Sequence, residues 1–344
     1  MKIAIVFGGI SYEHEISIVS SIALKDVLKN DLIYIFLDEQ KDFYHIPNSN
    51  MQTSTFSTKE YKKYDKLTLN KQTFSKKTFI CTKKIEFDIV LNLVHGGYGE
   101  DGVLASLFDF FDIRFIGPRV EACSISINKF LTKSYSNSLG INVLDYKIYN
   151  KSKSDEINIK NYPVIIKPLK LGSSIGVSIV NKKDDLQYAL DSAFEFDNDI
   201  LIEPFINNIK EYNLAGCKID DEFIFSIIEE PKKNNFLDFD KKYLDFSSTK
   251  KVSPATISKQ IENQLKNNFK KIYNTIFEGS IIRCDFFVLD DTVYLNEINS
   301  IPGSMANYLF EDFNDLINRL CLNLPRQKSI NIRYDYISKI NSNK

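Results

Sequence analysis

Hydrophobic residues in the first third of the chain alternate between strand-like runs and helical spacings. Residues 2–7 form an apolar run that ends in two glycines, and residues 16–28 place apolar side chains at helical intervals. Two further apolar runs, 32–37 and 87–94, and a helical pattern over 103–111 continue the alternation. This order of elements predicts an α/β layer built on a parallel sheet.

The pattern breaks at Gly117-Pro118, a dipeptide typical of a domain boundary. Beyond it, residues 121–139 are expected to form one helix that ends at Gly140, and residues 257–277 a second helix. Short runs rich in β-branched and aromatic residues predict strands over residues 162–167, 174–180, 201–205, 280–289 and 293–300.

Three polar segments show little periodicity. Residues 40–84 are rich in Lys, Thr and Ser and are expected to form an elaborated loop or a short hairpin. Residues 232–254 form a long polar loop of the kind that often closes over a site, although a plain surface loop has the same pattern. No element is predicted after Pro325.

Composition narrows the class of protein. A chain of 344 residues with 43% hydrophobic residues can bury a core and is expected to divide into two or three domains. A net charge of −1 argues against nucleic-acid binding. No apolar run approaches the roughly 18–20 residues of a membrane span, and five dispersed cysteines form no disulfide or zinc pattern. We therefore expect a soluble protein of a reducing cytoplasm.

The runs 280–289 and 293–300 flank Asp290-Asp291 and predict an antiparallel hairpin. A three-residue loop would pair Leu289 with Val293. Side chains alternate between the two faces of a strand, so the pairing register decides which residues share a face.

In that register Asp285 faces Glu297 and Arg283 faces Asn299, whereas a two-residue turn would separate them. Two carboxylates and an amide oxygen suit Mg²⁺, and the arginine could hold a phosphate or a developing oxyanion. The same four residues could also form a solvated hairpin face with a surface ion pair.

Three glycine-rich turns follow predicted strands. Gly172, Ser173 and Ser174 begin a small-residue turn downstream of Lys167, and its backbone N–H groups could lie along phosphates. The turns at 8–15 (GGISYEHE) and 95–102 (HGGYGEDG) each lead towards a helix, a geometry that suits an anion or a small zwitterion. Each pattern also fits a tight turn without a ligand.

Other candidates are isolated charged residues. Lys242 and Tyr243 lie in the long polar loop. Glu203 and Glu211 bracket a connection between two parts of the chain, where a carboxylate can accept a ribose hydroxyl or an adenine amine. Taken singly, each fits a surface residue better than a site residue.

Taken in order, these segments resemble the D-alanine:D-alanine ligase family of the ATP-grasp fold. The resemblance implies an α/β protein with a Rossmann-like α/β domain over 1–117, a small central α+β domain over 118–205 and a larger α+β domain over 206–344. It is carried by GGISYEHEIS (8–17), HGGYGEDG (95–102), VIIKPLKLGSSIGV (164–177), KKYLD (241–245), RCDFFV (283–288) and NEINSIPG (296–303).

The implied activity is the joining of two D-alanine molecules for peptidoglycan precursor synthesis, with ATP and two Mg²⁺ ions or Mn²⁺. An acylphosphate of the first D-alanine would be the intermediate, and a cytoplasmic homodimer is expected. The alternatives are a D-alanine:D-lactate or D-alanine:D-serine ligase or another ATP-grasp carboxylate–amine ligase. A nucleotide-dependent oxidoreductase or a non-catalytic ligand-binding protein would explain the N-terminal α/β segment alone. Tyr243 favours D-alanine, because the resemblance ties loss of this tyrosine to depsipeptide formation.

The resemblance also implies roles for the candidate residues. Glu13 would orient the first substrate's ammonium group together with Ser173 and Tyr243, and His95 would lie near its carboxylate. Arg283 and the backbone N–H of Gly303 would stabilise the oxyanion. Asp285, Glu297 and Asn299 would hold the metal ions, with Glu297 bridging. The nucleotide would be bound by Lys129, Lys167, Gly172, Ser173, Ser174, Glu203, Phe205, Ile206, Glu211 and Lys242.

Two positions depart from the family pattern. Tyr308 stands where the family commonly has a serine that contacts the carboxylate of the second substrate, so Tyr308 is the candidate for that contact. Pro204 replaces a lysine beside the adenine, which leaves the base to Glu203 and backbone groups.

Overall fold

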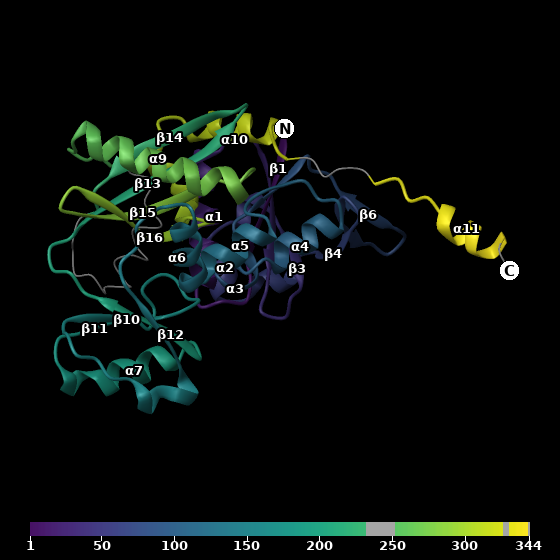
Figure 1. Ribbon diagram of the computed structural model, residues 1–344. Coiled ribbons are helices and arrows are strands. Elements are labelled where there is room, and N and C mark those ends of the chain that lie inside the picture. The colour runs from purple at the N-terminus through teal and green to yellow at the C-terminus, as the bar shows by residue number, and fades with distance from the viewer. Residues whose placement is uncertain (232–251, 326–329, 343–344) are drawn as a thin grey trace.

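The computed structural model describes residues 1–231, 252–325 and 330–342, and the strands within these ranges form three sheets (Figure 1). Each sheet is built from one continuous part of the chain. The first contains strands from residues 2–116, the second from 147–204 and the third from 210–299.

The first sheet has eight strands in the order β6-β5-β4-β3-β2-β1-β7-β8. Its parallel half confirms the predicted strand–helix alternation, because β1 pairs in parallel with β2 and β7, and β7 with β8. The elements of this half are β1 (Lys2–Gly8), α1 (His14–Val27), β2 (Asp31–Leu37), β7 (Ile89–Asn92), α3 (Gly97–Glu100), α4 (Val103–Phe110) and β8 (Phe115–Ile116).

The other half of this sheet corrects the prediction of a loop or short hairpin over residues 40–84. Four antiparallel strands extend the sheet from β2, because one-sided strands need an apolar residue only at every second position. Phe43 and Phe74 supply such anchors, with ring centroids 5.1 Å apart. The elements are β3 (Phe43–Ile46), η1 (Asn48–Asn50), α2 (Thr53–Ser57), η2 (Glu60–Lys63), β4 (Lys66–Asn70), β5 (Thr73–Lys77) and β6 (Thr82–Ile85).

The single helix expected over residues 121–139 is two helices, α5 (Val120–Ile127) and α6 (Lys129–Ser138). Asn128 separates them in an extended conformation, and its side chain accepts hydrogen bonds from the first free N–H groups of α6. This cap offsets the loss of helix continuity. It places Lys129 in the first turn of α6, whereas the predicted continuous helix placed it in mid-helix.

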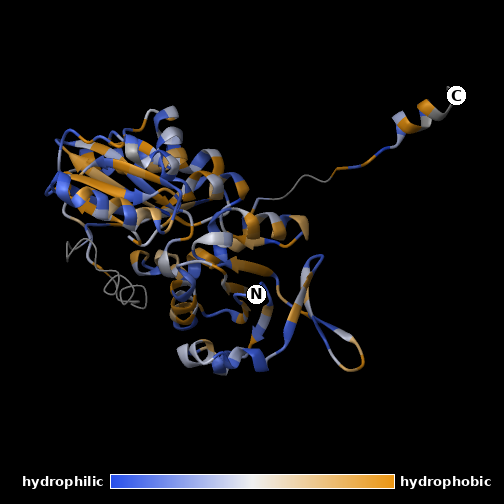
Figure 2. Ribbon diagram, turned by 90° about the horizontal axis from the view of Figure 1, so that it is seen from below, coloured by the Kyte–Doolittle hydropathy of each residue, from blue (hydrophilic) through white to orange (hydrophobic). Residues whose placement is uncertain are grey.

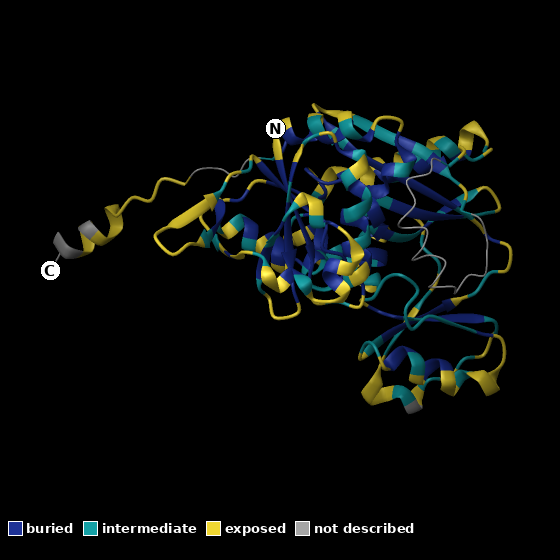
Figure 3. Ribbon diagram, turned by 180° about the vertical axis from the view of Figure 1, so that it is seen from behind, coloured by how far each residue is buried: buried dark blue, intermediate teal, exposed yellow. Residues whose placement is uncertain are grey.

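The second sheet has the order β11-β10-β12-β9 and a small core of its own. Figure 3 shows its buried strands beside the more exposed helix α7. Neither β9 nor α7 was predicted, and β11 starts four residues late because the small-residue segment before it is a loop. The elements are β9 (Lys147–Asn150), η3 (Lys151–Glu156), β10 (Val164–Pro168), β11 (Ser178–Val180), η4 (Lys183–Asp185), α7 (Leu186–Phe194) and β12 (Asp199–Pro204).

The third sheet has the order β14-β13-β15-β16, and the amphipathic helix α9 (Lys259–Ile276) packs on one face of it. Leu265, Phe269 and Tyr273 of α9 are buried there, at the four-residue spacing of an amphipathic helix. The strands are β13 (Lys210–Ile219), β14 (Glu222–Glu229), β15 (Ile282–Leu289) and β16 (Thr292–Asn299).

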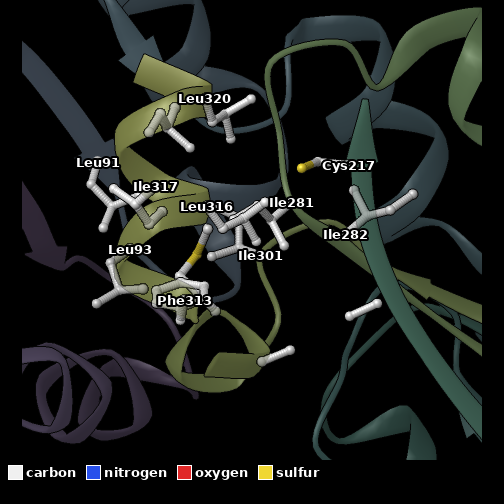
Figure 4. Packing of buried hydrophobic residues seen from close by; sticks show 14 of the residues in the cluster. Leu91, Leu93, Cys217, Ile281, Ile282, Ile301, Phe313, Leu316, Ile317 and Leu320 are labelled. Atoms are coloured by element: carbon white, nitrogen blue, oxygen red, sulfur yellow. The ribbon is translucent and has the colours of Figure 1, made fainter. Parts of the chain in front are cut away.

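Helix α10 (Phe313–Leu322) joins the first and third sheets into one core. Leu316 and Ile317 lie among Leu91 of β7, Leu93 directly after β7, and Ile281 directly before β15 (Figure 4). The second sheet is outside this core.

At the end of the chain, α11 (Asp335–Ser342) lies apart from the rest of the molecule with several apolar residues exposed (Figures 1 and 2). Within the ranges that the structure describes, no helix combines the length and apolar character that crossing a membrane requires.

The β15–β16 hairpin confirms the predicted pairs but not the predicted turn. Asp285 pairs with Glu297 and Arg283 with Asn299, yet Leu289 pairs with Thr292, so the turn has two residues. The prediction that the loop needs an odd length was therefore wrong. A β-bulge supplies the missing residue, because Asp285 pairs with Glu297 while its neighbour Phe286 pairs with Leu295, which leaves Asn296 as the extra residue.

Replacing Asp291 with glycine is expected to stabilise the protein by about 0.5–1 kcal/mol. Asp290 and Asp291 have φ values of 47° and 59°, a left-handed conformation that glycine adopts without steric cost. The measurement is the thermal unfolding midpoint, expected to rise by about 1–2 °C in a chain of this size. Asp221→Gly, in the equivalent turn before β14, is the comparison and should gain less, because Asp221 also pairs with Lys218 at 2.9 Å. A lower midpoint for Asp291→Gly would contradict this account of the turn.

Candidate active site

Glu13 connects the first part of the chain to the loop of the second sheet. It lies directly before α1 with 9% of its surface exposed, and Oε1 accepts a hydrogen bond from the hydroxyl of Ser173. Ser173 belongs to the small-residue loop between β10 and β11 and has a positive φ of 53°. The structure thus brings together the first and second of the predicted glycine-rich turns.

Glycines in the 95–102 turn and in the loop that begins at Gly172 leave space for the Glu13 carboxylate. A methyl group on Gly96 would lie 2.7 Å from Oε2 of Glu13, and one on Gly172 would lie 3.1 Å from Oε1. Side chains at either position would displace the carboxylate, so glycine is required for more than the turn itself. All three glycine-rich segments converge on one buried acid.

The described residues only partly compensate the negative charge of the Glu13 carboxylate. Burial raises the pKa of Glu13, although the Ser173 hydrogen bond and Lys129 act in the opposite direction. Burial and the nearby Glu13 raise the pKa of Glu100, at the end of α3, to about 8. A cationic group bound between these carboxylates would stabilise their ionised forms.

His95 lies at the end of the strand region that leads into the HGGYGEDG turn and is 3% exposed. Its Nε2 atom is 3.1 Å from the hydroxyl of Ser20, on α1. Burial lowers the pKa of the imidazole to about 3, so the ring is neutral at pH 7. Its Nδ1 atom makes no hydrogen bond to any residue that the structure describes.

A cluster of buried lysines surrounds Glu203, which is 2% exposed at the end of β12. Lys133 of α6 pairs with Oε2 at 2.9 Å, and Lys167 of β10 pairs with Oε1. Burial acts to raise the pKa of Glu203, but the two lysines outweigh it and lower the pKa to about 2. Lys129 lies one helical turn before Lys133, and burial lowers its pKa.

Lys133 was missed in the sequence. Its spacing of four residues from Lys129 placed both on one helix face, and that spacing was the available signal. Both lysines lie within the helix that was predicted over residues 121–139, and both lie in α6, so the signal did not depend on the break at Asn128.

The remaining nucleotide candidates follow β12. Phe205 donates its backbone N–H to the carbonyl of Pro163 at 3.0 Å, and Ile206 comes next in the connection to β13. Glu211 pairs with Phe287 across β13 and β15, two residues before the pair of Asn213 with Asp285. By strand alternation Glu211 therefore lies on the same face of the sheet as Asp285.

Arg283 and Asp285 form a two-point ion pair, with Nε–Oδ1 and Nη2–Oδ2 distances of 2.7 and 2.8 Å. Asn299 donates its side-chain N–H to Oδ2 at 3.0 Å. Burial raises the pKa of Asp285 to about 6; Arg283 opposes this shift and Glu297 adds to it. Two acids that repel each other in a buried place would gain from a cation between them.

The donor set of Asp285, Glu297 and Asn299 offers only oxygen to such a cation, which fits a hard ion such as Mg²⁺. Asn299 would have to rotate its amide to present the oxygen, because its nitrogen faces Asp285 in the structure. No cluster of three His, Cys, Asp or Glu side chains suited to a metal occurs in the described ranges. The amide is therefore needed to complete a third ligand.

Gly303 and Tyr308 both belong to η5 (Gly303–Leu309), where Gly303 is buried. Tyr308 lies beside Arg283, and burial raises the pKa of its hydroxyl to about 12 although Arg283 acts to lower it. Lys242 and Tyr243 lie outside the residues that the structure describes.

Comparison with known proteins decides the family. Residues 2–118 match the model for the D-ala D-ala ligase N-terminus, and residues 136–315 match the model for the D-ala D-ala ligase C-terminus. A relative from Campylobacter jejuni, named D-alanine–D-alanine ligase, is 54% identical over 344 residues, covering 100% of this chain and 99% of the relative.

The chain belongs to the D-alanine–D-alanine ligase family.

Solved structures agree with this assignment. A D-alanine–D-alanine ligase from Helicobacter pylori is 50% identical and superimposes with a TM-score of 0.86, over 95% of this chain and 100% of that one. A D-Ala:D-Ser ligase from Enterococcus faecalis, 24% identical over 93% of this chain and 98% of its own, shares the fold with a TM-score of 0.74. The mixed α/β architecture expected from the sequence is confirmed as the ATP-grasp fold of this family of ligases.

Glu203→Gln is expected to lower the stability of this ligase by about 3 kcal/mol at pH 7, because it leaves two buried lysines without a carboxylate. The pKa of Glu203 is lowered to about 2, so its stabilising effect is complete above the ordinary glutamate pKa and declines as pH falls towards 2. The difference between wild-type and variant unfolding midpoints should therefore shrink between about pH 4.5 and pH 3. Glu121→Gln, at an exposed position of α5, serves as the control. A difference that stays constant with pH would contradict the ion-pair explanation.

Proposed function

We propose that this chain joins two D-alanine molecules to D-alanyl-D-alanine with hydrolysis of ATP to ADP, as a step in peptidoglycan precursor synthesis. The observation that carries the proposal is the identity of 54% over the whole chain with a relative named D-alanine–D-alanine ligase. The γ-phosphoryl group of ATP is transferred to the carboxylate of the first D-alanine, which releases ADP and gives an acylphosphate. The amine of the second D-alanine then attacks the carbonyl of this acylphosphate and displaces inorganic phosphate, with loss of a proton from the amine.

Glu13 and His95 receive the first substrate. The ammonium group of D-alanine supplies the positive charge that the buried Glu13 and Glu100 lack, which the raised pKa values of both acids support. The Nδ1 atom of His95, which has no partner among the described residues, faces the substrate carboxylate. Ser173 holds Glu13 in place, and Tyr243 completes this contact.

The buried lysines bind the nucleotide. Lys129 and Lys167 neutralise the α- and β-phosphates, since the charge of Lys167 lowers the pKa of Lys129 and two cations that repel each other favour an anionic ligand. Lys242 reaches the γ-phosphate. Glu203 accepts a hydrogen bond from the adenine amine, and Glu211 accepts one from a ribose hydroxyl. The other residues that line the nucleotide site are Gly172, Ser173, Ser174, Phe205 and Ile206.

Asp285, Glu297 and Asn299 would hold two Mg²⁺ ions, for which Mn²⁺ could substitute, and Glu297 would be the ligand shared by both. When bound, these ions supply neutralisation of the phosphate charge during transfer. Arg283 and the backbone N–H of Gly303 stabilise the oxyanion that forms when the amine attacks. Tyr308, beside Arg283, contacts the carboxylate of the second substrate.

The larger organisation is also a proposal. The protein acts as a homodimer in the cytoplasm, with domains over 1–117, 118–205 and 206–344. The second sheet has a core of its own that is separate from the core shared by the other two sheets, which supports independent motion of that sheet when substrates bind, whereas Ala122 and Ile141 pack in the shared core.

The decisive experiment supplies D-alanine as the only amino acid with ATP and Mg²⁺. We expect release of ADP and a dipeptide detected by mass spectrometry. D-lactate or D-serine added with D-alanine should yield little mixed product, because the proposed lid retains Tyr243. Turnover only when D-lactate or D-serine is present would instead assign the chain to a depsipeptide or mixed-peptide ligase.

Glu297→Gln tests the metal site separately. Loss of one carboxylate from two ions is expected to lower kcat for ADP release at least 100-fold and to raise the Mg²⁺ concentration needed for half-maximal rate. Glu222→Gln, at an exposed position of β14 in the same sheet, should leave both values unchanged. ATP turnover that persists at the wild-type rate in Glu297→Gln would contradict the assignment of Glu297 to the metal site.

A further inference from the structure

We propose that Ser20 is a positioning residue for this reaction. Its hydroxyl accepts a hydrogen bond from the backbone N–H of Ser304 and donates one to Nε2 of His95. The imidazole therefore carries its proton on Nδ1, and this N–H donates a hydrogen bond to the substrate carboxylate. The identity of the carboxylate rests on the proposed function, whereas the tautomer of His95 can be measured without any substrate.

Ser20 lies between two groups that otherwise belong to distant parts of the chain. It is completely buried on α1, and its Oγ atom is 3.0 Å from the backbone N of Ser304 and 3.1 Å from Nε2 of His95. A backbone N–H can only donate, so Ser304 is the donor in the first of these bonds. One of the two lone pairs of the Ser20 hydroxyl therefore accepts a hydrogen bond from η5.

The direction of the second bond follows from the acceptors available. Ser20 has one proton to donate, and within the described part of the chain its only other hydrogen-bond partner is Nε2 of His95. If Nε2 were the donor instead, the Ser20 proton would be buried without an acceptor and Nδ1 would be a buried acceptor without a donor. An unsatisfied buried group costs about 1–3 kcal/mol, which favours donation from Ser20 to Nε2.

The state of His95 agrees with this assignment. A neutral imidazole has one donor nitrogen and one acceptor nitrogen, and burial keeps this ring neutral by lowering its pKa to about 3. With Nε2 accepting, Nδ1 is the donor. Nδ1 is buried and makes no hydrogen bond to a described residue, so this N–H needs an acceptor that the described residues do not supply.

Ser304, to which Ser20 is hydrogen-bonded, begins a strained turn. Ser304, Met305 and Ala306 have φ values of 47°, 55° and 52°, and left-handed backbone costs a residue with a side chain roughly 1–2 kcal/mol. Three successive residues keep this conformation only if surrounding contacts hold them, and the Ser304–Ser20 bond is one of those contacts. The turn follows Gly303 directly, so Ser20 connects the proposed carboxylate donor to the backbone of the proposed oxyanion site.

The tautomer can be read by long-range ¹⁵N–¹H correlation spectra of protein labelled on histidine. The chain has only three histidines, His14, His45 and His95, so the signals can be assigned by single substitutions of the first two. We expect His95 to show the Nδ1–H form at pH 7. In Ser20→Ala, which removes the donor to Nε2, a substantial fraction should shift to the Nε2–H form.

Ser21→Ala is the matched control, because Ser21 is a buried serine of the same helix whose hydroxyl donates to the carbonyl of Ile18 at 2.7 Å. It should leave the His95 spectrum unchanged. Ser20→Cys has nearly the volume of serine and a weak S–H donor, so it should give an intermediate result and carries the test if Ser20→Ala does not fold. An Nε2–H form in the wild type, or spectra of both Ser20 variants that match the wild type, would overturn the proposal.

Kinetics supply a second readout. Ser20→Ala is expected to raise KM for D-alanine about tenfold, which corresponds to the loss of one well-placed hydrogen bond. Ser20→Cys should recover part of this change, and Ser21→Ala should match the wild type. If the wild type shows the Nδ1–H form but no activity with D-alanine, the proposed function fails while the role of Ser20 in orienting His95 stands.

Discussion

The buried carboxylate of Glu203 holds three elements of the site in register. It ends β12, pairs with Lys133 of α6 and with Lys167 of β10, and has almost no exposure to water. An acid in such a place is stable only if its charge is matched, so the two lysines, and with them the first turn of α6 and the glycine loop after β10, are constrained relative to one another. Lys129 and Ser173 occupy their positions because of this constraint.

The direction of pKa shifts separates two kinds of buried acid in this molecule. Glu203 has a lowered pKa because the protein itself supplies its counter-charges. Glu13 and Asp285 have raised pKa values because burial and neighbouring acids outweigh the partners that the protein provides. Acids of the second kind lack part of their counter-charge, which is the condition expected where an ammonium group and metal ions bind. The first kind maintains the structure around them.

Much of the fold was predictable because its elements have strong periodicity. The parallel strands, α1 and α9 carry apolar residues at spacings that leave little choice of structure. The antiparallel extension over residues 43–85 was not predictable in this way, since its strands are short, polar on one face and anchored by few side chains such as Phe74. The division between α5 and α6 depends on one asparagine cap, a signal that the helical pattern around it obscured.

The candidate site was predictable by residue type and less so by geometry. Residue pairing in the β15–β16 hairpin was right, yet the reason given for it was wrong, because no odd-numbered loop is present. Lys133 was missed because its role exists only through a partner 70 positions away in the chain. The direction of the hydrogen bond between Ser20 and His95 could not be predicted from local sequence. It depends on the contacts of Ser20 with both His95 and Ser304, and the three residues lie far apart in the chain.

The bulge at Asn296 shows why the hairpin reaches the same pairing by another route. Two left-handed aspartates form a tight turn whose twist suits the flanking strands, and a regular ladder from that turn would pair Asp285 with Asn296. Glu297 would then fall on the opposite face, towards α9. One extra residue in β16 restores Glu297 to the face of Asp285, and the side chain of that residue accepts a hydrogen bond from Lys167 at 3.4 Å. The bulge therefore places both carboxylates on one face and connects them to the lysine cluster. The two-residue turn alone would not give this arrangement of the site.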